Sequence, residues 1–186
     1  MVVSGQASVF ATRIGWFAVA WSDQGLAALT FGHADGETAQ AALRCSATVP
    51  TALDDDDQEK RALVVRMQAY VDGRRDDFRD VPLDLTGLTD FQRRVSLACR
   101  AIPWGETLTY GQLAARVGSP EAARAVGGVM ARNRLPIVIP CHRVLGTAGS
   151  LGGYSAAGGL TTKRRLLHLE GVAPFFATKG DLECKI

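Results

Sequence analysis

The sequence predicts an α+β protein made of two units. Three short apolar runs fill the first forty of its 186 residues, which is typical of an antiparallel sheet. Helix-start signals gather in the second half. The charge also divides: residues 1–85 hold 8 Lys and Arg against 13 Asp and Glu (net −5), and residues 86–186 hold 13 against 6 (net +7). We therefore expect domains at 1–85 and 86–174, with a tail at 175–186.

The N-terminal runs read SVFATRIG, WFAVAWS and GLAALTFG, and are separated by Gly15 and by the turn Asp23-Gln24-Gly25. Helices are expected at 37–43 and 58–71, the second ending at Gly73. The acidic run at 54–57 precedes this second helix. Its position indicates a favourable interaction of the carboxylates with the helix dipole rather than a metal site. Apolar side chains at helical spacing predict a stripe that packs in the core: Leu63, Val64, Met67, Tyr70 and Val71.

The segment 76–88 contains Pro82 and little helical periodicity, so it predicts a linker or an edge strand. Three helix starts follow it. Thr89 with Gln92 and Thr109 with Gln112 fit capping boxes, and Ser119 before a proline fits an N-cap. These signals predict helices at 90–101, 110–117 and 120–131.

The last two of these helices are joined by a tight turn at Gly118, as in a helix-turn-helix. The second is composed mainly of Ala and Gly around a single basic residue, Arg124. A helix that reads the major groove usually presents several Arg, Asn or Gln side chains. Two explanations remain open for this composition: tight packing within the domain, or close approach to another molecule.

The stretch PIVIPCHRV predicts an apolar strand that ends at Cys141. A cysteine in such a stretch is often a packing residue, but a thiolate is a nucleophile, and His142 and Arg143 would help lower the thiol pKa. Because neighbouring side chains of a strand point to opposite faces, His142 needs a turn at Cys141 or a bridging water to act as its base. Glu170 is one candidate to orient that histidine.

Several function classes are excluded or disfavoured. The chain has no apolar run of the ~18 residues that span a membrane and no secretory leader, so we expect an intracellular protein, cytoplasmic in a prokaryote or nuclear in a eukaryote. Its four cysteines are widely spaced, which indicates free thiols and no structural metal. The basic second half is compatible with an ordinary soluble surface or with an anionic partner such as nucleic acid.

PCHRV at 140–144, preceded by ARAVGGVMARNRLPIVI and followed by GGYSAAGGLTTKRRLLHLEG, resembles the O6-alkylguanine-DNA alkyltransferases, also called methylated-DNA–protein-cysteine methyltransferases. The resemblance covers about 91–171, including IPWGETLTYGQLA; the first half is similar only in its order of elements. It implies a ribonuclease H-like domain followed by a winged helix-turn-helix domain. It also implies DNA repair without a cofactor: an alkyl group passes irreversibly from O6-alkylguanine in double-stranded DNA to the protein's own cysteine, in a single turnover.

By this resemblance Cys141 is the alkyl acceptor, His142 deprotonates it through a water, and Glu170 holds the histidine. Asn133 corresponds to a hinge residue, and Tyr110 to the tyrosine that helps rotate the target phosphate. The alkylguanine pocket corresponds to four residues: Met130, Val144, Tyr154 and Ser155. In the second helix of the helix-turn-helix, which the family places in the minor groove, Arg124 corresponds to the arginine that inserts into the base stack in place of the extruded nucleotide. Ala123, Gly127 and Tyr110 correspond to further DNA contacts.

Two departures from the family pattern matter. The segment SAAGG before Leu160 is two residues longer than the family's form, which leaves the range of alkyl groups open. The zinc-binding pattern of some relatives is absent, since only His33 and Cys45 lie in that region. A monomer is expected, with cooperativity on DNA open. The rival hypotheses are a non-catalytic sensor of alkylated DNA, which Cys141 disfavours, a winged-helix transcription regulator, and a cysteine hydrolase.

Overall fold

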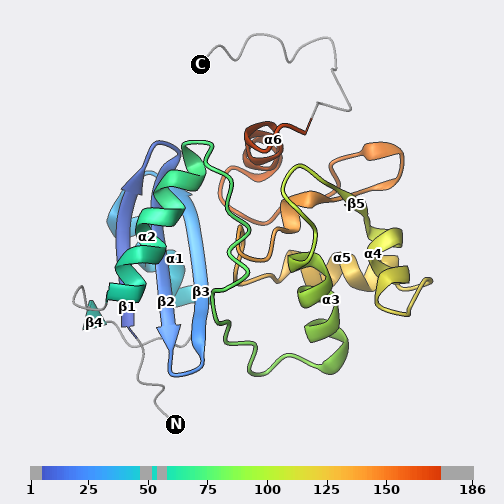
Figure 1. The fold of residues 1–186 in the computed structure, drawn as a ribbon, viewed down its shortest axis with the longest axis horizontal. Helices are drawn as coiled ribbons and strands as arrows, with labels where there is room; N and C mark the ends of the chain where they lie inside the picture. Colours follow the sequence, from blue (N-terminus) through green and yellow to red (C-terminus); the bar gives the residue numbers. More distant parts are fainter. Residues whose placement is uncertain (1–5, 47–51, 54–57, 173–186) are drawn as a thin grey trace.

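The computed structural model describes residues 6–46, 52–53 and 58–172. A sheet with two helices lies beside a mainly helical half (Figure 1). The N-terminal elements are β1 (Gln6–Thr12), β2 (Gly15–Ser22), β3 (Gly25–His33), α1 (Gly36–Ser46), β4 (Ala52–Leu53) and α2 (Gln58–Val71). The C-terminal elements are α3 (Asp90–Arg100), β5 (Leu108–Thr109), α4 (Tyr110–Arg116), α5 (Ala123–Ala131), β6 (Val144–Leu145) and α6 (Gly159–Leu169), with 3₁₀ turns at Cys141–Arg143 and Thr147–Gly149.

The predicted meander is confirmed. The strand order is β3-β2-β1-β4, with β1–β2 and β2–β3 antiparallel and the short β4 parallel to β1. Gly25 has a φ of +127°, and a Cβ there would lie 2.5 Å from the carbonyl oxygen of Pro82. The turn into β3 therefore requires glycine, for its backbone conformation and for the close approach of the next segment.

Helices α1 and α2 cover opposite faces of the sheet (Figure 1), and side-chain size differs between the two faces. Along β2, Ala18 and Ala20 pack in the cluster that contains side chains of α1, whereas Phe17, Val19 and Trp21 alternate with them in the larger cluster. This follows from the two-residue repeat of a strand. The larger cluster continues through side chains of α2 into the helical half and includes Cys141.

The segment after α2 runs along the edge of β3. Leu26 donates its backbone N–H to the Pro82 oxygen at 2.9 Å and accepts from Asp84 N–H at 2.9 Å, which makes one parallel bridge to Leu83. The edge pairing expected at 76–88 is thus limited to a single bridge. A side-chain hydrogen bond of 2.6 Å from Ser22 to Asp84 ties the segment to β2.

Both capping boxes are confirmed, at Thr89 and at Thr109. The predicted start of the third helix is wrong. Helix α5 begins at Ala123, and its N-cap residue Ala122 makes no side-chain capping bond. The physical reason is the short connection from α4: Ser119 N–H bonds Ala114, and the Ser119 carbonyl accepts from Ala122 N–H at 2.9 Å, so these residues form the turn instead of the first helical turn.

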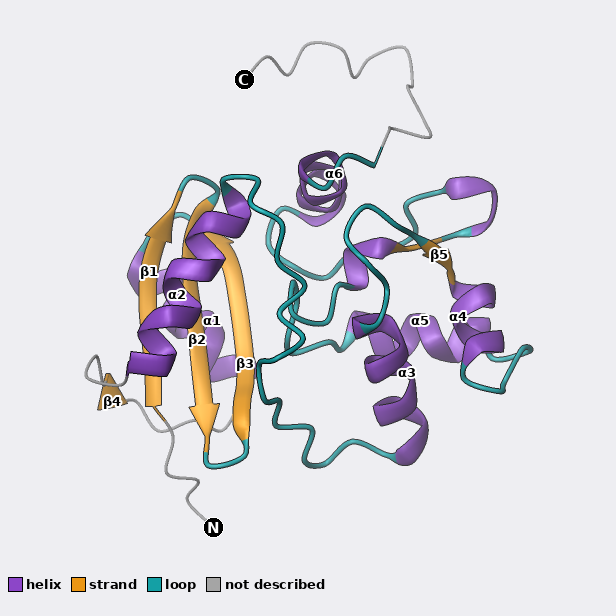
Figure 2. Ribbon diagram, viewed as in Figure 1, coloured by secondary structure: helices purple, strands orange, loops and turns teal. Residues whose placement is uncertain are grey.

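The strand predicted at PIVIPC is also wrong. Residues 132–140 form turns, and the connection between α5 and α6 is mostly loop (Figure 2). The stretch is apolar because it is buried, not because it pairs in a sheet: Leu135, Val138 and Ile139 are at most 3% exposed. Ile137 has a φ of +74°, a left-handed conformation that an extended strand cannot contain.

Within the described ranges, no helix has the length and apolar character to cross a bilayer. The same residues contain no group of three or more His, Cys, Asp or Glu side chains placed to hold a metal ion. The acidic run at 54–57, the predicted tail at 175–186 and Cys184 lie outside the described residues.

Candidate active site

Cys141 begins the 3₁₀ turn Cys141–Arg143 and is buried. A turn at Cys141 was one of the two conditions under which His142 could act as its base, and the structure has this turn. Directly after it, β6 pairs in parallel with β5, with Val144 opposite Leu108. This pairing brings the start of α4, and hence Tyr110, beside the segment that carries the cysteine.

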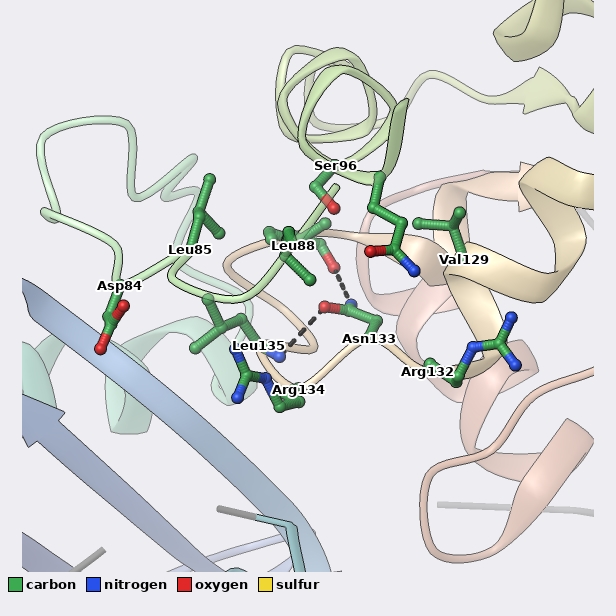
Figure 3. A pocket seen from close by; sticks show the side chains of 11 residues that line it. Asp84, Leu85, Leu88, Ser96, Val129, Arg132, Asn133, Arg134 and Leu135 are labelled. Atoms are coloured by element: carbon green, nitrogen blue, oxygen red, sulfur yellow. Dashed lines mark hydrogen bonds between the residues drawn. The ribbon is translucent and has the colours of Figure 1, made fainter. Parts of the chain in front are cut away.

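Asn133 shapes the loop that leads to Cys141. Its Nδ2 donates to the Ile139 carbonyl at 2.8 Å, and its Oδ1 accepts from Leu135 N–H at 3.0 Å (Figure 3). These bonds replace the backbone pairing that the loop lacks. The loop also lines a cavity of about 40 Å³. Among the described residues that line this cavity, Asn133 is the only one predicted to belong to the functional site.

His142 and Glu170 form a buried pair. His142 Nε2 lies 2.9 Å from Glu170 Oε1, and both side chains are fully shielded from solvent. Burial lowers the pKa of His142 below its usual value, so the imidazole is neutral at pH 7. With Nε2–H donating to the carboxylate, Nδ1 is the acceptor, and it has no hydrogen-bond partner among the described residues. The ring is therefore poised as a base.

Arg143 holds the other side of the carboxylate. Its Nε and Nη2 donate to Glu170 Oε2 and Oε1 at 2.8 and 2.9 Å, and Nη1 donates to the Ile102 carbonyl at 2.5 Å. Despite its burial, Glu170 has its pKa lowered to about 2 by the hydrogen bonds and charges of His142 and Arg143. The prediction that Arg143 helps to ionise the Cys141 thiol is therefore not supported, because the Arg143 guanidinium binds Glu170 instead.

Burial raises the pKa of the Cys141 thiol, against the prediction of a lowered value. A side-chain hydrogen bond with Asn133 and the positive charge of Lys163 partly oppose this rise. Lys163 is fully buried, and its Nζ donates to the carbonyls of Val144 and Leu151 at 2.6 and 2.5 Å. Burial lowers the pKa of Lys163 to about 8. The thiol is protonated at rest and needs a base.

Lys163 was missed by the sequence reasoning, although a signal exists. It lies three, four and seven residues before Leu166, Leu167 and Glu170, so the apolar face of α6 carries a buried cation at one end and a buried anion at the other. Charged residues on such a stripe indicate a polar site inside the core.

The predicted pocket residues are brought together, with one exception. Met130 and Val144 are buried in the same cluster as Cys141, and Tyr110 and Tyr154 pack against it. The Tyr154 hydroxyl is buried and has no nitrogen or oxygen hydrogen-bond partner among the described residues. Burial and the Cys141 thiol raise the pKa of Tyr154. Ser155 differs, because it is exposed.

Arg124 lies on the exposed face of α5. On the same helix, a Cβ added to Gly127 would make only ordinary contact, 3.9 Å from the Tyr110 ring, and one on Gly128 would lie 3.3 Å from the flexible end of Arg132. Packing within the chain therefore does not require glycine at these positions. For these two glycines, tight packing against the described residues is thus not the reason, and close approach by another molecule stays a prediction.

The chain combines a helix-turn-helix with a buried cysteine that is followed by a His–Glu pair. These features define a class of proteins in which a nucleic-acid-binding element accompanies a candidate cysteine nucleophile. Two family models match it: "6-O-methylguanine DNA methyltransferase, ribonuclease-like domain" at residues 7–85 and "6-O-methylguanine DNA methyltransferase, DNA binding domain" at residues 90–172. The chain belongs to this family, and the predicted fold class is confirmed.

Similar proteins agree. The chain is 37% identical over 164 residues to a methylated-DNA–protein-cysteine methyltransferase of Methanosarcina acetivorans, covering 88% of this chain and 97% of that one. It is 50% identical over 107 residues to one of Mycobacterium bovis, covering 58% of this chain but only 62% of the relative. The crystal structure of Mycobacterium tuberculosis OGT in complex with DNA is similar to this chain, with a TM-score of 0.71 and 37% sequence identity. The match covers 89% of this chain and 92% of that one.

Tyr70 is a second residue that the sequence reasoning missed. It lies on α2, in the stripe predicted to be core, and its hydroxyl donates to Glu170 Oε1 at 2.5 Å. No local pattern could have found this contact, because the two residues are 100 positions apart. The N-terminal half thus reaches the candidate active site.

Proposed function

We propose that this chain repairs O6-alkylguanine in double-stranded DNA by transferring the alkyl group irreversibly to Cys141, once per molecule and without a cofactor. One observation carries the proposal: a neutral, buried His142, oriented by Glu170, follows a buried cysteine on a tight turn. Residues 86–174 form the catalytic DNA-binding unit, and residues 1–85 support it. The chain acts as a monomer where DNA is found, in the cytoplasm of a prokaryote or the nucleus of a eukaryote.

The chemical step begins with removal of the thiol proton. His142 Nδ1, which has no hydrogen-bond partner among the described residues, accepts that proton through one water molecule, and Glu170 stabilises the imidazolium that forms. The Lys163 charge favours the thiolate at the same moment. A buried thiol that ionises only when its base is in place is protected from other electrophiles until the substrate arrives.

The thiolate sulfur then attacks the alkyl carbon. The new S–C bond forms as the C–O6 bond breaks, and the electron pair of the broken bond passes to guanine. Hydrogen bonds from the Tyr110 hydroxyl or the Ser155 backbone N–H stabilise the departing base. The base takes up one proton, which balances the thiol proton that passed to His142. The product is a thioether, which guanine is too weak a nucleophile to cleave, so the reaction stops after one turnover.

The alkylated base must leave the helical stack to reach Cys141, which costs a few kcal/mol of unstacking. Arg124, which is exposed on α5, fills the gap in the stack in this proposal, and the small residues Ala123 and Gly127 let the helix approach the minor groove. Tyr110 turns the target phosphate at the start of α4. Met130, Val144 and Tyr154 enclose the base above the thiol, with Ser155 at the exposed rim.

The test is the intact mass of the protein after incubation with a duplex oligonucleotide that contains O6-methylguanine. We expect one methyl group on Cys141, complete at one equivalent of DNA, and none in Cys141→Ser. A non-catalytic sensor or a winged-helix regulator would bind without any mass change, and a cysteine hydrolase would show repeated turnover of an ester or peptide. An unmodified wild-type protein contradicts the proposal.

A further inference from the structure

Tyr70 is the one residue of the N-terminal sheet-and-helix half whose side chain bonds to Glu170 among the described residues. Its hydroxyl lies 2.5 Å from Glu170 Oε1 and 3.4 Å from His142 Nε2. Glu170 Oε1 therefore accepts from three donors: Tyr70, His142 and Arg143. We infer that Tyr70 is a positioning residue for the alkyl transfer, which acts by fixing the carboxylate that orients His142.

The hydroxyl of Tyr70 acts as a donor throughout the working pH range. Burial, followed by the negative charge of Glu170, raises the pKa of Tyr70 well above its usual value. A tyrosine that stays protonated beside a carboxylate with a pKa of about 2 has one favourable arrangement, with its O–H directed at Glu170.

The ring of Tyr70 is held in place by its surroundings. It is completely buried, meets Trp104 edge-on with ring centroids 5.2 Å apart, and packs on Phe78 at 5.6 Å. Phe78 is itself fixed by its backbone, because its carbonyl accepts a 2.6 Å hydrogen bond from Arg100 of α3. The position of the Tyr70 hydroxyl is therefore fixed by a rigid part of the structure that is separate from the segments carrying Cys141, His142 and Glu170.

This bond has a predictable effect on His142. A donor on Glu170 Oε1 withdraws part of the negative charge that faces the imidazole, whereas the other charged groups nearby, Arg143 and Lys163, are unchanged when the donor is removed. Loss of the Tyr70 hydroxyl leaves Glu170 with a stronger field at His142, which favours the imidazolium. Removing the hydroxyl therefore raises the pKa of His142 and loosens the orientation of its ring.

The inference rests on the proposed function for its rate readout, and its second readout is independent of activity. In Tyr70→Phe we expect the rate of methyl transfer, and of reaction with free O6-benzylguanine, to fall about tenfold, because a hydrogen bond to a charged group is lost. In the same variant, NMR titration should show the His142 pKa raised by roughly half a unit. The acidic limb of the rate profile should move to higher pH by the same amount.

Ser22→Ala is the matched control. It removes a side-chain hydrogen bond of 2.6 Å between the N-terminal sheet and the following segment, away from Glu170. We expect it to lower the melting temperature comparably while leaving the His142 pKa and the transfer rate unchanged. If Tyr70→Phe proves too unstable, 3-fluorotyrosine at position 70 keeps the ring and strengthens the donor, so the His142 pKa should fall.

An unchanged His142 pKa, or a rate loss that Ser22→Ala shares, overturns the inference. Failure of the proposed function is recognised separately, because the wild-type protein then gains no methyl group, while the His142 titration still reports on Tyr70.

Discussion

Replacing Glu170 by Gln tests how much the buried carboxylate stabilises the fold. Glu170 is 3% exposed, and Arg143, which it binds through two hydrogen bonds, is 2% exposed. Glutamine keeps the shape but removes the charge, and the nearest carboxylate left to Arg143 is Asp77 at 3.4 Å. Removing one charge of a buried pair costs about 3–5 kcal/mol, because the other charge stays buried after losing its main partner. We expect the free energy of unfolding at pH 7 to fall by this amount.

The shift in the pKa of Glu170 gives a second value for the contribution of this carboxylate to the free energy of unfolding. The pKa of Glu170 is lowered from 4.5 to about 2 in the folded protein, so the folded state favours the charged carboxylate. At 1.36 kcal/mol for each unit, this corresponds to about 3 kcal/mol as an order of magnitude. The contribution is complete above the unfolded pKa of 4.5 and is lost as the pH falls towards 2. The difference between wild type and Glu170→Gln should shrink over the same interval.

Urea unfolding, followed by circular dichroism at several pH values, measures both effects. Glu121→Gln is the matched control, because Glu121 is exposed; it should change stability by less than about 0.5 kcal/mol. Adding Arg143→Met to Glu170→Gln should recover part of the loss, since no unpaired buried charge then remains. A Glu170→Gln protein as stable as the control, or a loss that is the same at pH 3 and pH 7, would refute the reasoning.

Two further predictions concern DNA. Arg124→Ala should slow methyl transfer from duplex DNA at least tenfold more than reaction with free O6-benzylguanine, because only the duplex requires a flipped nucleotide; equal losses in single-turnover rates with the two substrates would exclude this role. The affinity for DNA, measured by fluorescence anisotropy, should fall as salt rises, and neutralising one exposed arginine of α3, Arg93 or Arg94, should reduce the log–log slope by about 1. A slope that responds instead to Glu37 or another residue of the acidic half would contradict this assignment.

The features predicted well from sequence are those set by local chemistry. The meander follows from alternating apolar runs and turn glycines, and α2 begins and ends where its spacing and Gly73 indicate. The capping boxes fix the starts of α3 and α4, because each satisfies its backbone N–H groups within four residues. The family resemblance, and not spacing, is the source of the roles proposed for Cys141, His142 and Glu170.

The features predicted poorly depend on contacts between distant segments. An apolar run such as PIVIP is compatible with a strand or with a buried loop, and the choice depends on Asn133, whose amide bonds replace a neighbouring strand. The pKa of Cys141 could not be predicted from Arg143, two residues further along the chain, because that guanidinium binds Glu170. Lys163 and Tyr70 reach the site from other elements, and their contacts exist only once both halves have packed together.

Burial also determines which basic side chains of the second half of the chain are available to bind an anionic partner. Of the 13 Lys and Arg and 6 Asp and Glu in residues 86–186, two of each lie beyond residue 172, outside the described residues. Of those described, Arg143, Lys163 and Glu170 are buried in the site, which leaves nine basic and three acidic side chains, a net charge of +6, on the remaining positions. In the proposed function, the buried cations Arg143 and Lys163 are thus distinct from the basic side chains that could contact phosphates. Variants of Arg143 and Lys163 should therefore alter rate and stability with little change in the salt dependence of binding, whereas variants of Arg93 or Arg94, which have no proposed part in base flipping, should do the reverse.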